Sequence, residues 1–460
     1  MKRLISIQIL IVFLLSSCLV GKKYTRPDMQ VPQKYIYGDT IIATTDSVSA
    51  LAARDTSLNL QWFELFDDKT LNSLITLALD SNTNLRIAAM RVEQSRAYYK
   101  NANANIYPSI GYSAKADLKD PGDESFDILG TASWEIDFWG KLRHAKRAAY
   151  AEYLASEEGL KTVKTTLVSD VASLYFLLRD LDNRVEVANQ TLESRKTFYN
   201  IVNQRYLKGE SAELDKLQAE QQLALVQADL ASLHRELNIT ERSMNILLGQ
   251  NPQPVPRGLQ NADQVVIPLI PVGLPSTLLE QRPDVKAAEN ILLAETEKIG
   301  VAQAMRLPSF SLTGFLGLAS DDITTLLDGG SLAAGATGMI TGPIFEFGKN
   351  KRRVEIQKAE AEIALNSFFD TYRKALGDVE NALDGIQSYR EEYTARMRQV
   401  EAARKALVLT RAKYDAGYTN YLEVLIAESY AFDAEMLASF TRGQQLTSTV
   451  SLYRALGGGW

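Results

Sequence analysis

Apolar residues recur every three or four positions along the stretch from Gly140 to Gly209. They fall at Leu160, Val163, Leu167, Val171, Leu174, Leu178, Leu181, Val185, Ala188 and Leu192. A mean spacing of about 3.5 residues predicts a helix that supercoils left-handedly against a partner helix. Glu, Lys, Arg and Gln fill most positions between them, so the pattern indicates a coiled-coil helix and not a membrane span.

A tight turn near Gly209 is followed by a second helical pattern that ends at Gly249. If the first stretch is helical throughout, its length is roughly 100 Å at about 1.5 Å per residue. The sequence therefore predicts a long helical hairpin over residues 140–249, which is more than a globular domain usually accommodates.

The same stretch occurs a second time in the chain. Gly140-Lys141 recurs 208 residues later as Gly348-Lys349, and the turn glycines Gly209 and Gly417 keep this offset. It also relates Asp170-Val171 to Asp378-Val379, Tyr206 to Tyr414, Leu214 to Leu422 and Leu248-Gly249 to Leu456-Gly457. A constant offset over such a length indicates an internal duplication, with a second helical hairpin over residues 348–457.

A different period follows Pro108. Apolar and polar residues alternate from Ile110 to Leu118 and from Phe126 to Phe138, around a turn at Asp120-Pro121-Gly122-Asp123. This predicts a β-hairpin over residues 109–138, and a copy of it over residues 309–345. About ten residues is the length of a tilted membrane strand, but alone the alternation favours a hairpin that covers a soluble core.

Four such strands cannot close a barrel, because about eight is the practical minimum. Membrane strands also leave no open edge in lipid, so several chains would have to pool their strands. Three copies would supply twelve, which lies within the range of outer-membrane barrels. The predicted fold is therefore mainly α, with a trimeric 12-stranded transmembrane β-barrel and long coiled-coil helical hairpins that form an α-barrel.

The N-terminus has the layout of a secretory signal peptide, with Lys2-Arg3, an apolar run from Leu4 to Leu15 and small residues before Cys18. Cys18 is the only cysteine in the sequence. We predict that residues 1–17 are a lipoprotein signal peptide and that Cys18 is lipidated, each buried CH₂ contributing about 0.8 kcal/mol. A signal peptide with a stray thiol is the alternative. Val20 stands where Asp would indicate inner-membrane retention, which favours the outer membrane.

Composition shifts mark the remaining boundaries. They give a lipidated linker at residues 18–58, a first repeat at 59–250, a Pro-rich connector at 251–275 and a second repeat at 276–460. Within the repeats we expect a helix from Trp62 to Ile106, interrupted near Asp80-Ser81-Asn82, and a second helix from Leu278 to Met305.

Charge and composition narrow the function classes. The net charge of −6 argues against nucleic acid as a partner, and 46% hydrophobic residues argue against disorder. The two histidines, His144 and His234, lie in no metal-ligand pattern, and we expect both at solvated helix positions. With no phosphate loop or Ser/His/Asp arrangement in the sequence, we expect neither an enzyme nor a cofactor or metal site.

Several motifs, in their order and spacing, resemble the TolC-type outer-membrane efflux proteins, and most closely their OprM/NodT-like lipoprotein branch. These are Cys18-Leu19-Val20-Gly21, Trp62-Phe63 with Phe66-Asp67-Asp68, Ser133-Trp134-Glu135-Ile136-Asp137 with Gly140-Lys141-Leu142-Arg143, and Arg282-Pro283-Asp284-Val285 with Pro308-Ser309. The resemblance implies a homotrimer with a shared barrel and a periplasmic helical tube. It also implies work with a periplasmic adaptor and an inner-membrane pump of the RND type.

The resemblance assigns roles at the two turns as well. Gly209 and Gly417 would lie at the periplasmic tip. Glu423 matches an acidic ring position of the family, and three copies would form a carboxylate ring that favours cations. Leu422 would add an apolar constriction, and Ile426 stands where relatives often carry Asp.

A second set of tip residues would join neighbouring copies. Tyr414 matches a tyrosine that forms hydrogen bonds between neighbours in relatives, and Asp215 matches its acidic partner. A basic residue of the same network in some relatives falls on Thr419 here.

Two further functions fit the sequence. One is a lipid-anchored periplasmic coiled-coil tether without a pore, and the other is a type I protein secretion outer-membrane channel. An envelope hydrolase has no catalytic constellation in this sequence.

Overall fold

The computed structural model describes residues 20–21, 24–29, 31–37, 68–118, 124–264 and 275–458. The predicted signal peptide at residues 1–17 and the predicted lipidation site Cys18 lie outside the described residues. The chain divides into two compact units. Unit 1 contains Met1–Gln30, Ala88–Gly159 and Asp284–Thr371, and unit 2 contains Val31–Ile87, Leu160–Pro283 and Tyr372–Trp460.

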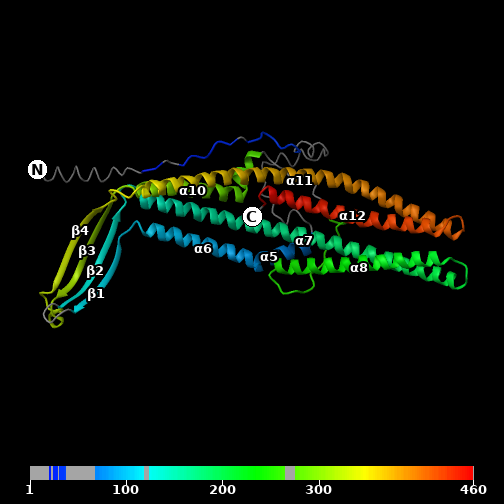
Figure 1. Cartoon of the computed structure of the whole chain (residues 1–460), viewed down its shortest axis with the longest axis horizontal. Coiled ribbons are helices and arrows are strands. Elements are labelled where there is room, and N and C mark those ends of the chain that lie inside the picture. The colour runs from blue at the N-terminus through cyan, green and yellow to red at the C-terminus, as the bar shows by residue number, and fades with distance from the viewer. Residues whose placement is uncertain are drawn as a thin grey trace. The chain divides into compact units, whose positions relative to one another are not determined.

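Long helices account for most of the described chain (Figure 1). They are α7 (Lys141–Leu207, 67 residues), α8 (Glu213–Leu247, 35 residues), α11 (Lys349–Asp415, 67 residues) and α12 (Tyr421–Ala455, 35 residues). The apolar seam predicted for α7 is buried or half-buried along its length: Val171, Leu178 and Ala188 are fully inaccessible, and no residue of the seam is exposed. No helix in the described ranges has both the length and the apolar character that crossing a bilayer requires.

The two long hairpins have matching lengths at a constant displacement. α11 begins 208 residues after α7 (349 − 141), and α12 begins 208 residues after α8 (421 − 213). The shorter helices α6 (Thr83–Ala104) and α10 (Pro283–Ala304) have 22 residues each and are displaced by 200 (283 − 83). Both helix pairs thus keep the offsets read from the sequence.

Short helices precede α6 and α10. α5 (Lys69–Ser81) ends at Asn82, inside the predicted interruption, and Asn82 Oδ1 accepts the N–H of Leu85 at 3.0 Å to begin α6. The corresponding segment holds the 3₁₀ turn η1 (Pro275–Thr277) and α9 (Leu278–Gln281), which ends at Arg282.

One packing contact repeats between the halves. Asn82 Nδ2 donates to the carbonyl of Leu247, the last residue of α8, at 2.8 Å. Arg282, 200 residues later, donates to the carbonyl of Ala455, the last residue of α12, at 3.2 Å. In each half a polar side chain therefore satisfies a carbonyl that a helix end leaves without an intrahelical donor.

Unit 1 carries an antiparallel sheet in the order β1-β2-β3-β4. Its strands are β1 (Ser109–Leu118), β2 (Glu124–Ile136), β3 (Ser309–Ser320) and β4 (Leu332–Thr341), with the 3₁₀ turn η2 (Ile323–Thr325) between the last two. Both expected hairpins are antiparallel, and β2 pairs with β3, for example Ile128 with Leu318. The two hairpins therefore form one sheet, with β1 and β4 at its edges.

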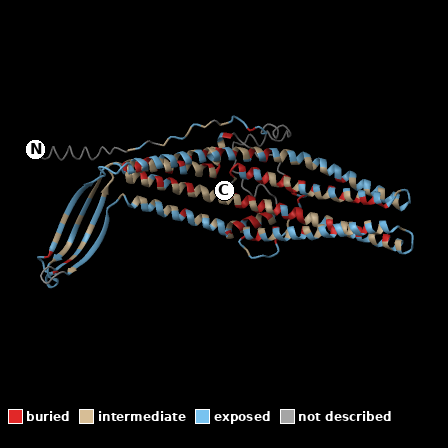
Figure 2. Ribbon diagram, in the orientation of Figure 1, coloured by how far each residue is buried: buried red, intermediate tan, exposed pale blue. Residues whose placement is uncertain are grey.

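The core of unit 2 lies where α5 and the segment 251–264 pack on α7 (Figure 2). Leu71 and Ile75 of α5 are fully buried, as are Tyr175 and Phe176 of α7. Buried side chains of this size contribute about 1.5–3 kcal/mol each relative to exposure. This core fixes the middle of α7, from which the helix continues toward its turn.

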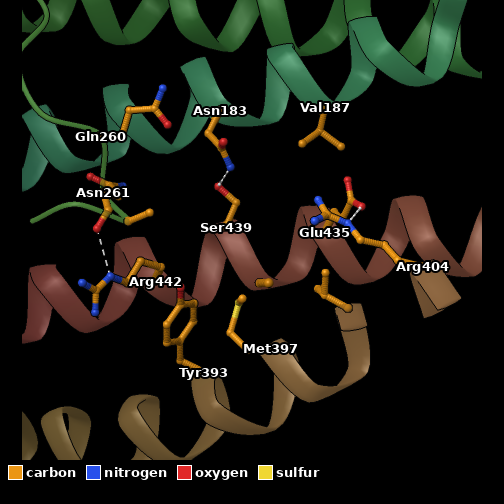
Figure 3. A pocket seen from close by; sticks show the side chains of 13 residues that line it. Asn183, Val187, Gln260, Asn261, Tyr393, Met397, Arg404, Glu435, Ser439 and Arg442 are labelled. Carbon is orange, nitrogen blue, oxygen red and sulfur yellow. Dashed lines mark hydrogen bonds and ion pairs between the residues drawn. The ribbon is translucent and has the colours of Figure 1, made fainter. Parts of the chain in front are cut away.

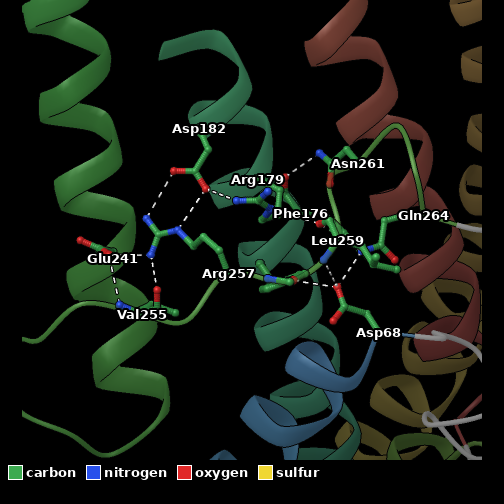
Figure 4. Close-up of polar contacts among 12 residues, drawn as sticks. Asp68, Phe176, Arg179, Asp182, Glu241, Val255, Arg257, Leu259, Asn261 and Gln264 are labelled. Carbon is green, nitrogen blue, oxygen red and sulfur yellow. Dashed lines mark hydrogen bonds and ion pairs between the residues drawn. The ribbon is translucent and has the colours of Figure 1, made fainter. Parts of the chain in front are cut away.

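Asp68 connects the three elements of this core (Figure 4). Its carboxylate accepts the N–H of Thr70 at 2.9 Å, which caps α5, and the hydroxyl of Tyr175 at 2.7 Å and the amide of Gln264 at 2.8 Å. Burial alone would raise the pKa of Asp68, but the hydrogen bonds from Tyr175, Gln264 and two backbone N–H groups hold it below its usual value. The network therefore favours an ionised carboxylate.

His144 is not the solvated helix position that the sequence suggested. Its side chain is 3% exposed, and Nδ1 lies 2.5 Å from Glu297 Oε2 on α10. A Cβ built at Gly300 would lie 2.7 Å from the imidazole ring, so the packing is tight. The prediction was wrong because the first turns of α7 are covered by α10, which helical periodicity alone does not reveal. His234 is exposed, as expected.

Candidate functional site at the helical turns

The turns that join the long helices have the same backbone geometry. Gly209 has φ +75° and Gly417 has φ +74°, a left-handed conformation that glycine adopts without strain. The N–H of Gly209 donates to the carbonyl of Tyr206 at 2.9 Å, and that of Gly417 donates to the carbonyl of Tyr414 at 3.0 Å. Both glycines therefore end a 67-residue helix in the manner of a C-cap.

An aromatic cluster holds the start of α12 against α7. Tyr421 stacks on Phe198 with ring centroids 4.1 Å apart and an interplanar angle of 7°. Val202 and Val424 are buried in the same cluster, and Tyr414 packs at its edge. Aromatic pairs of this kind contribute about 0.5–1.5 kcal/mol beyond the burial of their area.

Tyr414 finds its partner within its own chain. Arg205 Nη1 donates to the Tyr414 hydroxyl at 3.0 Å, and the guanidinium lies 5.7 Å from the ring centroid. The sequence suggested that the basic residue of this network is missing, since Thr419 occupies the expected position. Arg205 was overlooked because it lies 209 positions before Tyr414, and no local pattern connects the two residues.

Asp215 lies in the first turn of α8 and accepts a hydrogen bond from Ser211 Oγ at 2.9 Å. Tyr414 is engaged with Arg205 instead. The described contacts of one chain therefore do not bring Asp215 and Tyr414 together.

Leu422, Glu423 and Ile426 share the exposed side of α12 at its first two turns. Leu422 is 49% exposed and Ile426 is 42% exposed, and Glu423 is exposed as well. The side chain of Asn420 caps the helix by accepting the N–H of Glu423 at 3.2 Å. Since Tyr421 and its buried neighbours face α7, α12 presents one carboxylate and two aliphatic side chains away from its own chain.

A group of charged and polar residues, which we call the charged layer, lies about two turns beyond the start of α12. Glu428 is buried and accepts a hydrogen bond from Arg411, and Arg411 also donates to Ser194 Oγ at 2.6 Å. The buried Arg195 donates to the carbonyl of Gln222 at 2.9 Å, and burial lowers its pKa. The charged layer (Ser194, Arg195, Arg411 and Glu428) thus connects all four long helices, and no sequence pattern pointed to it.

A cavity of about 240 Å³ lies farther from the turns in unit 2, between α7, α11, α12 and the segment 251–264 (Figure 3). Arg442 Nε on its wall donates to the carbonyl of Asn261 at 2.9 Å, and Asn183 donates to Ser439 Oγ at 2.9 Å. Within the described residues no three His, Cys, Asp or Glu side chains are grouped to hold a metal ion. The polar residues of this cavity join helices to each other.

Comparisons with known proteins agree with one another. The family model described as outer membrane efflux protein matches residues 74–250 and 274–458. The cation efflux system protein CusC of Escherichia coli O6:H1 is 31% identical over 454 residues, which cover 97% of this chain and 96% of CusC. The probable outer membrane lipoprotein SilC of Salmonella typhimurium is 29% identical over 458 residues, which cover 98% of this chain and 97% of SilC.

Among solved structures, the outer-membrane channel OprN matches with a TM-score of 0.86 at 30% sequence identity. The match covers 96% of this chain and 100% of that chain. The likeness therefore extends over the helical hairpins, the sheet and the turns alike.

Proposed function

This chain belongs to the outer membrane efflux protein family, and on that premise we propose that three copies form a channel whose entrance is closed at the helical turns. Members of this family are outer-membrane components of efflux systems, and their role is transport rather than catalysis. The trimeric assembly, the gate and the partners are what we add to that role.

The observation that carries the proposal is the four-stranded sheet with two open edges. Within the described chain β1 and β4 each pair on one side only. Strand β1 is exposed along nearly its whole length, with Ile110 at 87% and Tyr112 at 89%. Apolar strands with free edges suit a barrel shared between copies, because a bilayer offers no partner for open edges. Three copies would close it with twelve strands.

The long helices would continue this barrel as a periplasmic α-barrel. The equal lengths of α7 and α11, and of α8 and α12, support two structurally equivalent halves that arose by duplication. Two hairpins from each of three copies would give a ring of helices with the turns at Gly209 and Gly417 at its end. We retain the predicted division into linker, first repeat, connector and second repeat as part of this proposal.

The gate would be formed by Leu422, Glu423 and Ile426. All three lie on the side of α12 that its own chain leaves open. Three copies would place three Glu423 carboxylates in one ring, which attracts cations and repels anions. Leu422 and Ile426 would narrow the same passage with aliphatic side chains. Asp215 would meet Tyr414 of a neighbouring copy, since the two do not meet within one chain.

The remaining parts of the proposal concern attachment and partners. Lipidated Cys18 would anchor the chain to the outer membrane, in keeping with the description of SilC as a lipoprotein. A periplasmic adaptor and an inner-membrane pump of the RND type would meet the turns. In this arrangement the pump supplies the energy and the channel conducts passively.

Single-channel recording in planar bilayers tests the gate. The purified protein should give small, mostly closed currents, and Glu423→Ala should raise the open conductance because the carboxylate ring is removed. Glu401→Ala is the matched control, since Glu401 is an exposed glutamate on α11 that pairs with Lys405 at 2.6 Å. Folded protein that forms no pore would favour the alternative function, a lipid-anchored periplasmic coiled-coil tether. Such a tether has no barrel, so its migration on gels would not change on heating.

A further inference from the structure

We propose that Phe315 presents an aromatic ring on the inner wall of the shared barrel, where it contacts solutes that carry an aromatic ring as they pass. Leu129 of the neighbouring strand extends the same apolar contact. The inference rests on the proposed channel and adds a residue that distinguishes one class of cargo from another.

Strand pairing gives the sheet two faces of different character. Side chains alternate between the faces along each strand, and paired residues share a face. One row of the apolar face consists of Tyr112, Gly130, Leu316 and Ala334. On the opposite face Lys115 lies across from Asp127. Membrane barrels turn their apolar face to lipid and their polar face to the interior, so the face of Lys115 and Asp127 would line the pore.

Phe315 belongs to the polar face although its side chain is apolar. It lies opposite Thr131 of β2 and Gly335 of β4. Thr131 shares a face with Asp127, because the two residues are four positions apart on one strand. The other β3 residues on this face are Ser309, Ser311, Thr313, Gly317 and Ala319. Among the described strand residues Phe315 is the one aromatic residue on the polar face, at a position where the alternation predicts a small or polar side chain.

The neighbouring residues leave room for the ring. A Cβ built at Gly335 would lie 2.7 Å from Cε1 and Cζ of Phe315, so a side chain at Gly335 would displace the ring. Leu129 lies opposite Gly317 and is therefore a diagonal neighbour of Phe315, at a separation of about 7–8 Å that large side chains bridge. Phe315 is 39% exposed. The ring thus covers a glycine and keeps enough free surface to contact a solute.

Polar rows on both sides limit the apolar contact to these two residues. Lys115 and Asp127 lie beyond Leu129, and Ser133 lies opposite Thr313 on the other side of Phe315. A ring over a glycine also stabilises a strand, and that role requires no contact with cargo. Because the rest of this wall is polar, a solute with an aromatic ring gains a contact at Phe315 that a solute without one does not.

Cysteine accessibility in planar bilayers tests the position of the ring. Phe315→Cys and Leu316→Cys are adjacent in sequence but lie on opposite faces of β3. A charged methanethiosulfonate reagent that does not cross lipid should lower the open-channel current of Phe315→Cys and leave that of Leu316→Cys unchanged. The unmodified protein controls for Cys18, the sole native cysteine. Equal modification of both positions, or of Leu316→Cys alone, would overturn the inference.

Block of the open channel by two small cations of equal charge tests the contact. Benzylammonium should reduce the current at a concentration about twofold to fivefold lower than ethylammonium does, as expected for a partly exposed aromatic contact. Phe315→Ser should remove most of this difference. Thr313→Ser, on the same face of β3, is the matched control and should preserve it.

Phe315→Leu keeps an apolar side chain without the ring, so it should give an intermediate ratio, and it replaces Phe315→Ser if that variant forms no pores. A ratio that neither variant changes, in protein that still conducts, would overturn the inference and leave the channel intact. Unmodified protein that forms no pore would overturn the proposed function, and the inference with it.

Discussion

The two helical hairpins share a backbone but differ in what their turns carry. Both have a 67-residue helix, a glycine with φ near +75° and a 35-residue helix. At the second turn, α12 is capped by the side chain of Asn420 and packs on Phe198 of α7, whereas α8 begins after Ala212 without a side-chain cap. The two hairpins thus share their geometry, and the aromatic and charged contacts that hold the start of a 35-residue helix are found at the second turn. The difference indicates that the second turn is the more firmly held of the two within one chain.

The largest expected effect is at Glu428. Its removal in Glu428→Ala leaves the buried Arg195 and the half-exposed Arg411 without this carboxylate. Because Arg411 stays solvated, the loss should lie at the lower end of the cost of breaking a buried ion pair, on the order of 3 kcal/mol. The counterpart on α8, Glu220, is exposed, and Glu220→Ala should change stability by less than about 0.5 kcal/mol. Denaturant unfolding of the detergent-solubilised protein compares the two. Equal effects would remove the distinction between the hairpins.

The next effect in size is at the aromatic stack. Phe198→Ala removes the ring that covers Tyr421, and because Phe198 is only half-buried we expect a loss of about 2 kcal/mol, below the range for full burial. The counterpart substitution Ala406→Ser should lie within about 0.5 kcal/mol of the unmodified protein. The same unfolding measurement applies, with protease sensitivity of the second turn as an independent readout. An unchanged midpoint for Phe198→Ala would contradict the role of the stack.

A smaller effect on stability, dependent on pH, is expected at Asp68. Its carboxylate accepts a hydrogen bond from Tyr175 of α7, and the corresponding residue of α11 is Leu383, which cannot form such a bond. The pKa of Asp68 is lowered in the folded chain, so its contribution is present above the ordinary value of about 3.9 and is lost as the pH falls through the folded pKa. Asp68→Asn, which also weakens the α5 cap, should cost about 1 kcal/mol at pH 7 and reduce the loss of stability below about pH 4.

Thermal unfolding at pH 7 and at acid pH, for the unmodified protein and the variant, measures the difference. Asp80→Asn, at an exposed position near the end of α5, is the matched control. The interpretation fails if Asp68→Asn leaves the acid dependence unaltered.

The smallest effect is at the hydroxyl of Tyr414. Tyr414→Phe removes one hydrogen bond from Arg205, which contributes about 0.5–1.5 kcal/mol. We expect a modest rise in open probability in planar bilayers. Tyr206→Phe is the matched control, because Tyr206 holds the corresponding position on α7. An unchanged open probability for Tyr414→Phe would contradict the role of this hydrogen bond.

The sequence predicted what depends on local pattern. The seam of α7 follows from spacing, the turns follow from Gly209 and Gly417, and the antiparallel hairpins follow from alternation. Each of these predictions depends on residues within a few positions of one another, and at that range periodicity and backbone preference determine the secondary structure. The constant offset between the halves needed no structural information either.

What the sequence did not reveal depends on which helix faces meet. Arg205 reaches Tyr414 across 209 positions of the chain, and Arg411 reaches Ser194 across 217. His144 looked like a surface residue because nothing near it in sequence indicates the cover provided by α10. The family resemblance placed a basic residue of the tip network at the position of Thr419. In the structure, Arg205 of α7 contacts Tyr414 instead.

The assembly itself is the claim on which the gate, the barrel and the contact between copies all depend. Native mass spectrometry of the protein released from outer membranes in mild detergent measures it directly. We predict a single dominant species of three chains that resists dissociation until it is heated. A species of one or two chains, from protein with intact strand content by circular dichroism, would contradict the account.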